Sequence, residues 1–193
     1  ATTLAAVKIG VKVAHLEAGL RSFDRTMPEE VNRVVTDALA DLLWTPSPDG
    51  DENLMREGVK PEKIVRVGNI MIDSLEMLRP IIEKEKASTR YGLLKGSFGI
   101  VTLHRPSNVD NKDALSKLCE VLIRVSEKLP LIFPVHPRSK KNLENWGLLE
   151  KLDKCQNIKL EEPLSYIKFM SLIFDCGLVI TDSGGIQEET SYL

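Results

Sequence analysis

Short apolar runs alternate with longer amphipathic stretches along the whole chain. Runs rich in apolar and β-branched residues predict strands, and apolar positions spaced three or four residues apart predict helices. Strands are expected at 11–15, 42–45, 64–67, 98–103, 131–135, 158–160 and 178–181, and helices at 28–43, 49–57, 112–128, 141–152 and 166–174, with a last helix from near Gly185. The helix over 28–43 carries Val31, Val34, Val35, Ala38, Leu39 and Leu42 on one side. Strands separated by such helices predict parallel crossovers and an α/β sheet covered on both faces.

One segment, residues 69–91, interrupts this rhythm. It is mostly polar, helical in pattern, and contains Pro80. We therefore place a domain junction near residue 72, with one Rossmann-like domain over 1–72 and a second over 73–193. Because residues 1–10 have the pattern of a helix end and residues 185–193 only open a helix, we expect the chain to be a fragment, with the N-terminal domain truncated and the C-terminal domain incomplete.

Composition excludes several classes of protein. The chain has 26 Lys and Arg against 28 Asp and Glu, a net charge of −2, so it shows no basic footprint for nucleic acid or an anionic membrane. No apolar run approaches the ~20 residues that span a bilayer, and the first residues lack a signal-peptide pattern. The three cysteines are scattered, without disulfide or zinc spacing. The sequence favours a cytoplasmic protein with no nucleic-acid partner, no membrane partner and no metal.

All three histidines of the chain follow predicted strands. In open α/β sheets, ligands bind beyond the carboxyl ends of the strands. His15, His104 and His136 are therefore candidate ligand-binding residues, together with the loop Asp182-Ser183-Gly184-Gly185 after the last strand.

The Gly-Gly loop leads directly into a helix. Glycines let backbone N–H groups approach a ligand closely, and the N-terminus of a helix favours an anion. Ser183, Gly184 and Gly185 are thus a candidate phosphate cradle. The alternative is that Asp182 or Ser183 only caps the helix. Glu189, further along, could accept hydrogen bonds from ligand hydroxyls.

Two glutamates flank the loop over 18–28. Glu17, at the end of a strand, is a candidate acid or base, or else an ion-pair partner of Arg21 or Arg25. Glu29 is a second candidate, but Thr26-Met-Pro-Glu29 has the spacing of a capping box, which would bond it to the start of its helix.

His104 and Arg105 together suit a group that gains negative charge, unless His104 only bonds a loop carbonyl. His136, with Arg138, Lys140 and Lys141, forms a local basic cluster that is either a second anion site or a solvated helix start. Tyr166 and Phe169 are three residues apart on a helix, so core packing is the first expectation and stacking on a base the second.

Taken together, these segments resemble those of a known family, the non-hydrolysing UDP-N-acetylglucosamine 2-epimerases. The matching blocks, in the family's order, are His15–Arg21, Pro28–Arg33, Gly68–Asp73, Thr102–Arg105, Pro134–Pro137 and Thr181–Glu189. The resemblance covers essentially the whole chain. It implies a GT-B-like architecture of two Rossmann-like domains with the active site in the cleft between them, no cofactor, and a homodimer.

The resemblance also implies a reaction: removal of the C2 proton of UDP-N-acetylglucosamine, elimination of UDP, and re-addition to give UDP-N-acetylmannosamine. By the same resemblance Glu17 and Glu29 are catalytic, and His104 contacts the diphosphate and assists its departure. Ser183, Gly184 and Gly185 bind the β-phosphate, Glu189 the ribose and Phe169 the uracil. Arg105 and His136 match a second, allosteric substrate site.

The sequence departs from the family after Arg105, where Pro106 and Ser107 replace a common arginine and glutamate. The family's catalytic aspartate would precede Ala1, and its closing motif would follow Leu193. Three other functions stay open: a hydrolysing epimerase, a GT-B glycosyltransferase with an external acceptor, and a non-catalytic module that binds nucleotide sugars.

Overall fold

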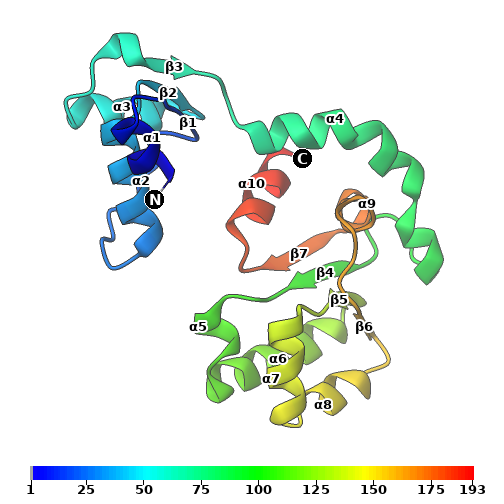
Figure 1. The fold of residues 1–193 in the computed structure, drawn as a ribbon. Coiled ribbons are helices and arrows are strands. Elements are labelled where there is room, and N and C mark those ends of the chain that lie inside the picture. Colours follow the sequence, from blue (N-terminus) through cyan, green and yellow to red (C-terminus); the bar gives the residue numbers. More distant parts are fainter. Residues whose placement is uncertain (1) are drawn as a thin grey trace. The chain divides into compact units, whose positions relative to one another are not determined.

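The computed structural model describes residues 2–193. The chain forms two compact units, unit 1 over Ala1–Asp73 and unit 2 over Ser74–Leu193. Figure 1 labels their helices and strands. The assignment of the two halves as an N-terminal and a UDP-binding domain stays a prediction.

Unit 1 is built on a small parallel sheet. Its elements are α1 (Thr2–Lys8), β1 (Ala14–Leu16), α2 (Pro28–Leu39), β2 (Leu42–Thr45), α3 (Pro48–Arg56), a 3-10 turn (Pro61–Lys63) and β3 (Ile64–Arg66). The strands lie in the order β1-β2-β3, with Ala14 opposite Leu42 and Leu43 opposite Ile64. The buried core consists of Ala18, Ala40, Leu43 and Leu54. The carboxyl end of β1, at Leu16, leads directly into the loop that carries Glu17.

Unit 2 contains a four-stranded parallel sheet. Helix α4 (Ile70–Glu85) begins in unit 1; then follow a 3-10 turn (Ala87–Tyr91), β4 (Gly99–Thr102), α5 (Pro106–Val109), α6 (Lys112–Ser126), β5 (Leu131–Pro134), α7 (Pro137–Asn145), α8 (Leu149–Asp153), β6 (Ile158–Glu161), α9 (Tyr166–Asp175), β7 (Leu178–Thr181) and α10 (Gly184–Tyr192). The strand order is β6-β5-β4-β7.

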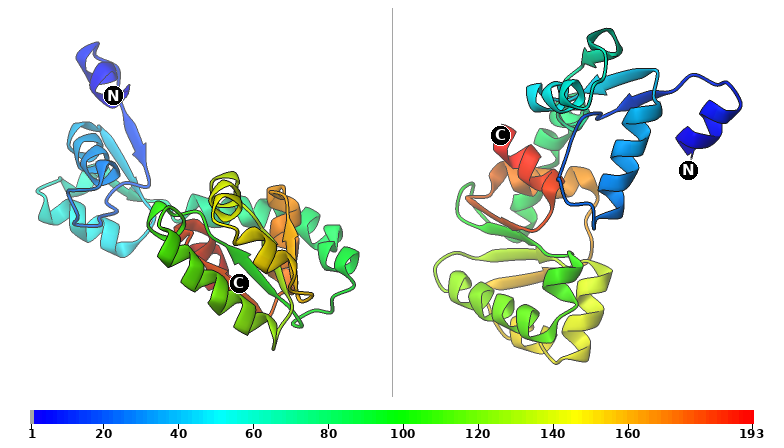
Figure 2. Two further views of the ribbon diagram at one scale, coloured as in Figure 1. Left: turned by 90° about the horizontal axis from the view of Figure 1, so that it is seen from below. Right: turned by 90° about the vertical axis from the view of Figure 1, so that its left-hand side faces the viewer.

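Two buried cores cover the two faces of this sheet. Leu131 and Phe133 of β5 point into a core shared with α6, α7 and α8, whereas Ile132 points into a core shared with α4 and α9. The alternation follows from the strand geometry, since successive side chains lie on opposite faces. Figure 2 shows the helices of unit 2 from two further sides. The expected α/β sheet covered on both faces is confirmed for unit 2.

The strand order places a switch point between β4 and β7. From β4 the chain moves outward through β5 to β6, and then returns to add β7 on the other side of β4. Connections that leave neighbouring strands in opposite directions open a crevice at their carboxyl ends, and this is where doubly wound sheets bind ligands. The loops after Thr102 and Thr181 meet at this point.

Two predicted helices differ from the structure. The helix expected over 28–43 ends at Leu39, because Ala40 is extended and Leu42 already belongs to β2. The helix expected over 141–152 is two helices, α7 and α8, separated at Gly147, whose φ of +66° is left-handed.

The side chains that α2 buries also differ from those its sequence pattern predicts. Val31 and Val35, on the apolar side of its pattern, are 46% and 47% exposed. Glu30 and Asp37 are instead buried, at 2% and 3%. Buried carboxylates need hydrogen-bond partners, and both have them, as described below.

None of the helices in the described part of the chain, residues 2–193, is long and apolar enough to cross a membrane.

Candidate active site

Asp182 organises the loop that follows β4. Its side chain is 7% exposed, and the carboxylate accepts hydrogen bonds from His104 N at 3.0 Å, Arg105 N at 2.9 Å and Asn108 Nδ2 at 3.0 Å. Arg105 Nε in turn donates to Asp182 O at 2.6 Å. One buried carboxylate thus ties together the carboxyl ends of β4 and β7 at the switch point.

The same carboxylate orients the His104 ring. His104 Nδ1 lies 3.0 Å from Asp182 Oδ1, and the imidazole is 40% exposed. An Nδ1–H directed at a carboxylate leaves Nε2 available to a ligand. The alternative that His104 only bonds a loop carbonyl is therefore wrong.

The Gly-Gly loop opens α10 as expected. Ser183 is the N-cap, with its hydroxyl accepting from Ile186 N at 3.5 Å, so the capping alternative also holds. Backbone N–H groups in the first turn of a helix have no acceptor within the helix, and they favour an anion here. A Cβ on Gly184 would lie 3.8 Å from Arg105 Nη2, which places the guanidinium beside this turn.

Glu189 is held by a tyrosine. The Tyr166 hydroxyl of α9 donates to Glu189 Oε1 at 2.6 Å, and Glu189 is 4% exposed. Burial, followed by the bond to Glu189, raises the pKa of Tyr166, so it stays a donor. Tyr166 itself is 38% exposed, so it is not the core residue expected from its spacing. Phe169 packs partly buried against the core under α9.

The basic cluster around His136 is mostly paired. His136 Nδ1 accepts from Arg138 N at 3.2 Å and caps α7, as one of the two interpretations had it. Arg138 pairs with Asp110, and Lys140 with Glu162. The His136 ring nevertheless lies 5.9 Å from that of His104, centroid to centroid, so it borders the switch point.

In unit 1, neither glutamate takes the structural role that competed with catalysis. Arg21 pairs with Asp37 and Glu57, not with Glu17, and Glu17 is exposed. Helix α2 begins at Pro28 with Met27 as its N-cap and no side-chain cap bond, so the capping box is wrong. The neighbouring Glu30 instead accepts Ser22 N at 2.9 Å and Phe23 N at 3.0 Å. Glu17 and Glu29 are both exposed, at the two ends of one loop.

The protonation of two buried carboxylates makes the stability of the protein pH-dependent. Burial alone would raise the pKa of Asp37 and of Asp182, but the hydrogen bonds that each accepts outweigh it and lower both pKa values. A carboxyl with a lowered folded pKa stabilises the fold above its unfolded pKa, and this contribution is lost as the pH falls through the folded pKa. We expect the free energy of unfolding to fall below about pH 4.

Urea unfolding at a series of pH values measures this effect. The acid-induced loss of unfolding free energy should be smaller in Asp37→Asn and Asp182→Asn than in the natural sequence, because each variant removes one titrating group. An unfolding free energy that is constant down to about pH 2 would contradict the assignment.

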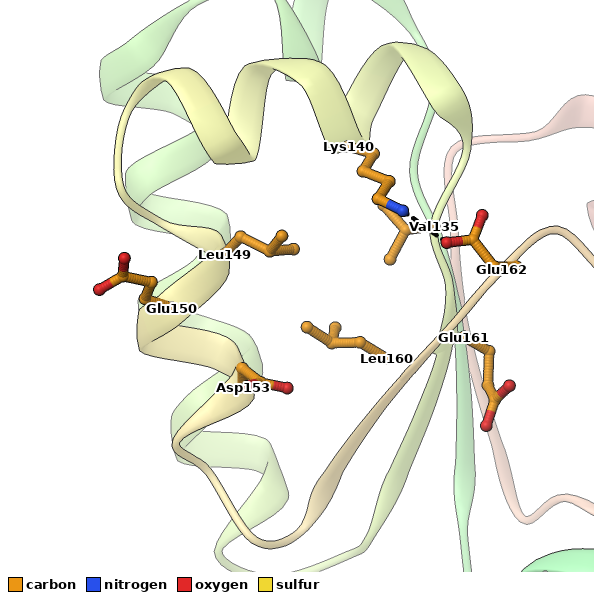
Figure 3. Close-up of a pocket in the computed structure, with 8 residues that line it drawn as sticks. All are labelled: Val135, Lys140, Leu149, Glu150, Asp153, Leu160, Glu161 and Glu162. Atoms are coloured by element: carbon orange, nitrogen blue, oxygen red, sulfur yellow. Dashed lines mark hydrogen bonds and ion pairs between the residues drawn. The ribbon is translucent and has the colours of Figure 1, made fainter.

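A cavity of about 390 Å³ lies beside the edge strand β6. Leu149 and Leu160 line it, and Lys140 pairs with Glu162 at its side (Figure 3). Asp153 adds a further carboxylate to its lining, which disfavours a diphosphate. Among residues 2–193, no group of three or more His, Cys, Asp or Glu side chains could hold a metal ion.

Three residues of the site had no assigned role in the sequence interpretation, or a different one. The sequence places Asp182 in the candidate ligand-binding loop and offers it as a helix cap, gives no signal for Asp37, and predicts packing or base stacking for Tyr166. The adjacency of Asp182 to the glycines was the one signal available. The partners of Asp37 and Tyr166 are distant in the sequence, and no local pattern marks them.

Comparison with known proteins places these features in a family. The family model described as UDP-N-acetylglucosamine 2-epimerase matches residues 1–193. The UDP-N-acetylglucosamine 2-epimerase of Methanococcus maripaludis is 43% identical over 198 residues, covering 100% of this chain and 54% of the relative. This chain thus spans about half the length of the curated relatives it matches.

Solved structures of UDP-GlcNAc 2-epimerases also match this chain. The crystal structure of Methanocaldococcus jannaschii UDP-GlcNAc 2-epimerase in complex with UDP-GlcNAc and UDP has a TM-score of 0.82 and 42% identity, covering 97% of this chain and 52% of that chain. The Rickettsia bellii enzyme has a TM-score of 0.84 and 29% identity, covering 100% of this chain and 50% of that chain. These structures are GT-B-like, so the expected α/β fold class with parallel sheets is confirmed.

Proposed function

Because the chain belongs to the UDP-N-acetylglucosamine 2-epimerase family, we propose that the whole protein interconverts UDP-N-acetylglucosamine and UDP-N-acetylmannosamine at C2. The observation that carries the proposal is the switch point of unit 2. There Asp182 holds the His104 loop against the N-terminus of α10. A helix N-terminus, which favours negative charge, lies beside an imidazole and a guanidinium. This combination suits a diphosphate.

The nucleotide half of the substrate is assigned to unit 2. The N–H groups of Gly184 and Gly185 and the Ser183 hydroxyl bind the β-phosphate, with His104 Nε2 directed at the departing oxygen. Glu189, already holding the Tyr166 hydroxyl at 2.6 Å, accepts from the ribose hydroxyls. Phe169 packs near the uracil ring.

The sugar half requires proton transfer at C2. One carboxylate of the pair Glu17 and Glu29 takes the C2 proton while the C1–O bond breaks, and the bonding pair leaves with UDP. The product of this step is 2-acetamidoglucal. Re-addition of UDP at C1, with a proton delivered to the opposite face of C2, completes the epimerisation. Two carboxylates free of structural bonds suit this task, since each must exchange a proton with substrate.

The other functions predict other products from the same incubation. We would incubate the full-length protein with UDP-N-acetylglucosamine and no acceptor, and resolve the products by chromatography. The proposal predicts UDP-N-acetylmannosamine at equilibrium with the substrate. Free N-acetylmannosamine with an equal amount of UDP would instead establish a hydrolysing epimerase. A sugar nucleotide that stays unchanged until an acceptor is added would establish a glycosyltransferase, and one bound but never converted would establish a binding module.

Ser183→Ala is expected to weaken UDP binding about fivefold, since it removes one hydrogen bond worth about 1 kcal/mol. Isothermal titration with UDP measures this effect. Ser191→Ala is the matched control, because Ser191 lies near the other end of the same helix and bonds only Gln187 O. An unchanged dissociation constant in Ser183→Ala would remove Ser183 from the phosphate site.

The remaining expectations stay predictions. An allosteric second site at Arg105 and His136, a homodimer, a cytoplasmic location and the absence of a nucleic-acid partner belong to the whole protein. Light scattering of the full-length protein tests the homodimer.

A further inference from the structure

Glu17 occupies a strained backbone position. Its φ is +64°, in the left-handed region that non-glycine residues rarely enter. Two residues later Gly19 has a φ of +80°. Strain of this kind persists only where the surroundings over-determine the conformation, and it concentrates at functional sites. The structure must therefore contain groups that hold residue 17 in place.

Asp37 of α2 provides the central support. The side chain of Asp37 is 1% exposed. Its Oδ1 bonds His15 Nδ1, and its Oδ2 accepts from Gly19 N at 3.1 Å. His15 and Gly19 lie two residues before and two residues after Glu17, so one carboxylate clamps both sides of the strained residue.

Further contacts fix Asp37 and the end of the loop. Arg21 Nη1 lies 2.7 Å from Asp37 Oδ2, and the Arg21 side chain is 1% exposed. Arg21 also donates two hydrogen bonds to Glu57, from Nε at 2.8 Å and from Nη2 at 2.7 Å. These bonds connect the loop to α2 and, through the exposed Glu57, to the end of α3.

Two further hydrogen bonds fix the backbone on the C-terminal side of Glu17. Ala18 N donates to Trp44 O at 3.0 Å, and Asn53 Nδ2 donates to Gly19 O at 3.0 Å. A Cβ on Gly19 would lie 2.3 Å from Gly50 O, so only glycine fits there. None of these bonds engages the Glu17 carboxylate, which stays exposed. The network fixes the backbone of residue 17 and leaves its side chain free.

We infer that Asp37 is a positioning residue for Glu17, which sets the direction of that carboxylate through His15 and Gly19. The inference rests on the proposed role of Glu17 as a proton-transfer group. Asp37 does not exchange a proton with substrate. It holds the acceptor at the geometry that C2 proton transfer requires, where an error of about 1 Å costs on the order of 100-fold in rate.

The test is a double-variant cycle in the full-length protein. Asp37→Asn should lower kcat on the order of 100-fold, with KM changed less than about twofold. In a Glu17→Gln background the same substitution should lower kcat by less than about twofold, because Asp37 acts only through Glu17. Asp41→Asn is the matched control, since Asp41 also accepts a backbone bond, from Val13 N at 2.9 Å, but lies outside the loop; its kcat should be unchanged.

A second variant keeps the test decisive where Asp37→Asn does not fold. His15→Phe removes only one of the bonds to Asp37, so we expect a smaller loss of kcat, about 10-fold, that again disappears in the Glu17→Gln background. A folded Asp37→Asn or His15→Phe variant with natural kcat would overturn the inference. Equal losses of kcat in the natural and the Glu17→Gln backgrounds would also overturn the inference. If Glu17→Gln itself keeps full turnover, the proposed role of Glu17 fails instead, which separates the two failures.

Discussion

Glu17→Gln is expected to lower kcat of the full-length protein on the order of 1,000-fold, while the affinity for UDP changes less than about twofold. Glutamine keeps the size and shape of glutamate but cannot accept a proton. The Glu17 side chain is exposed and takes part in none of the bonds that hold its loop. The substitution therefore removes the proposed proton-transfer group and leaves the fold in place.

Steady-state kinetics and titration with UDP measure the two quantities separately. Glu62→Gln, an exposed glutamate in the 3-10 turn of unit 1, is the control and should behave as the natural sequence. Losses of equal size in turnover and in UDP affinity would show that Glu17 supports binding or folding, and they would remove it from proton transfer.

Asp182→Ala has the second large expected effect, on both the stability of unit 2 and the binding of UDP. The change leaves the N–H groups of His104 and Arg105 without the acceptor they have at 3.0 and 2.9 Å. Each unsatisfied buried group costs about 1–3 kcal/mol. We expect the free energy of unfolding to fall by about 3 kcal/mol and UDP affinity by about 100-fold, since the His104 ring loses its orientation.

The sequence offers a clean readout for each unit. Its two tryptophans, Trp44 and Trp146, lie one in unit 1 and one in unit 2. In a Trp44→Phe variant of residues 1–193, urea unfolding followed by Trp146 fluorescence reports unit 2. Asp182→Asn, which keeps one acceptor oxygen, should lie between alanine and the natural residue.

Glu120→Ala, an exposed change on α6, is the control for Asp182→Ala and should shift unfolding by less than about 0.5 kcal/mol. Asp182→Ala with natural stability and natural UDP affinity would refute the role assigned to this carboxylate.

Most strands were predictable, although the strand expected over 11–15 is the shorter β1 over Ala14–Leu16. The segment 178–181 begins with the apolar residues Leu178, Val179 and Ile180 and lies between Gly177 and the Gly-Gly loop, and it is β7 without change. Helix ends were harder. Leu42 continues the helical spacing of α2 but lies in β2, because Asp41 N and Leu42 N donate to Val13 O and draw the chain into the sheet. Helix α5, with four residues, is too short to show a period.

The candidate site was predictable where its residues lie next to one another in the sequence. Ser183, Gly184 and Gly185 are contiguous, and the helix after them follows from its pattern. The bond between Asp182 and His104 joins residues 78 positions apart, and only the pairing of β4 with β7 brings them together. The Tyr166–Glu189 bond likewise depends on how α9 and α10 pack. Long-range contacts of this kind leave no trace in local hydrophobic periodicity.

The most direct measurement of the central claim is proton NMR of UDP-N-acetylglucosamine incubated with the full-length protein in heavy water. Elimination and re-addition must exchange the C2 hydrogen with solvent. The account predicts UDP-N-acetylmannosamine carrying deuterium at C2, with the sugar still joined to UDP. An epimer that retains its original C2 hydrogen, or release of free sugar in step with UDP, would contradict it.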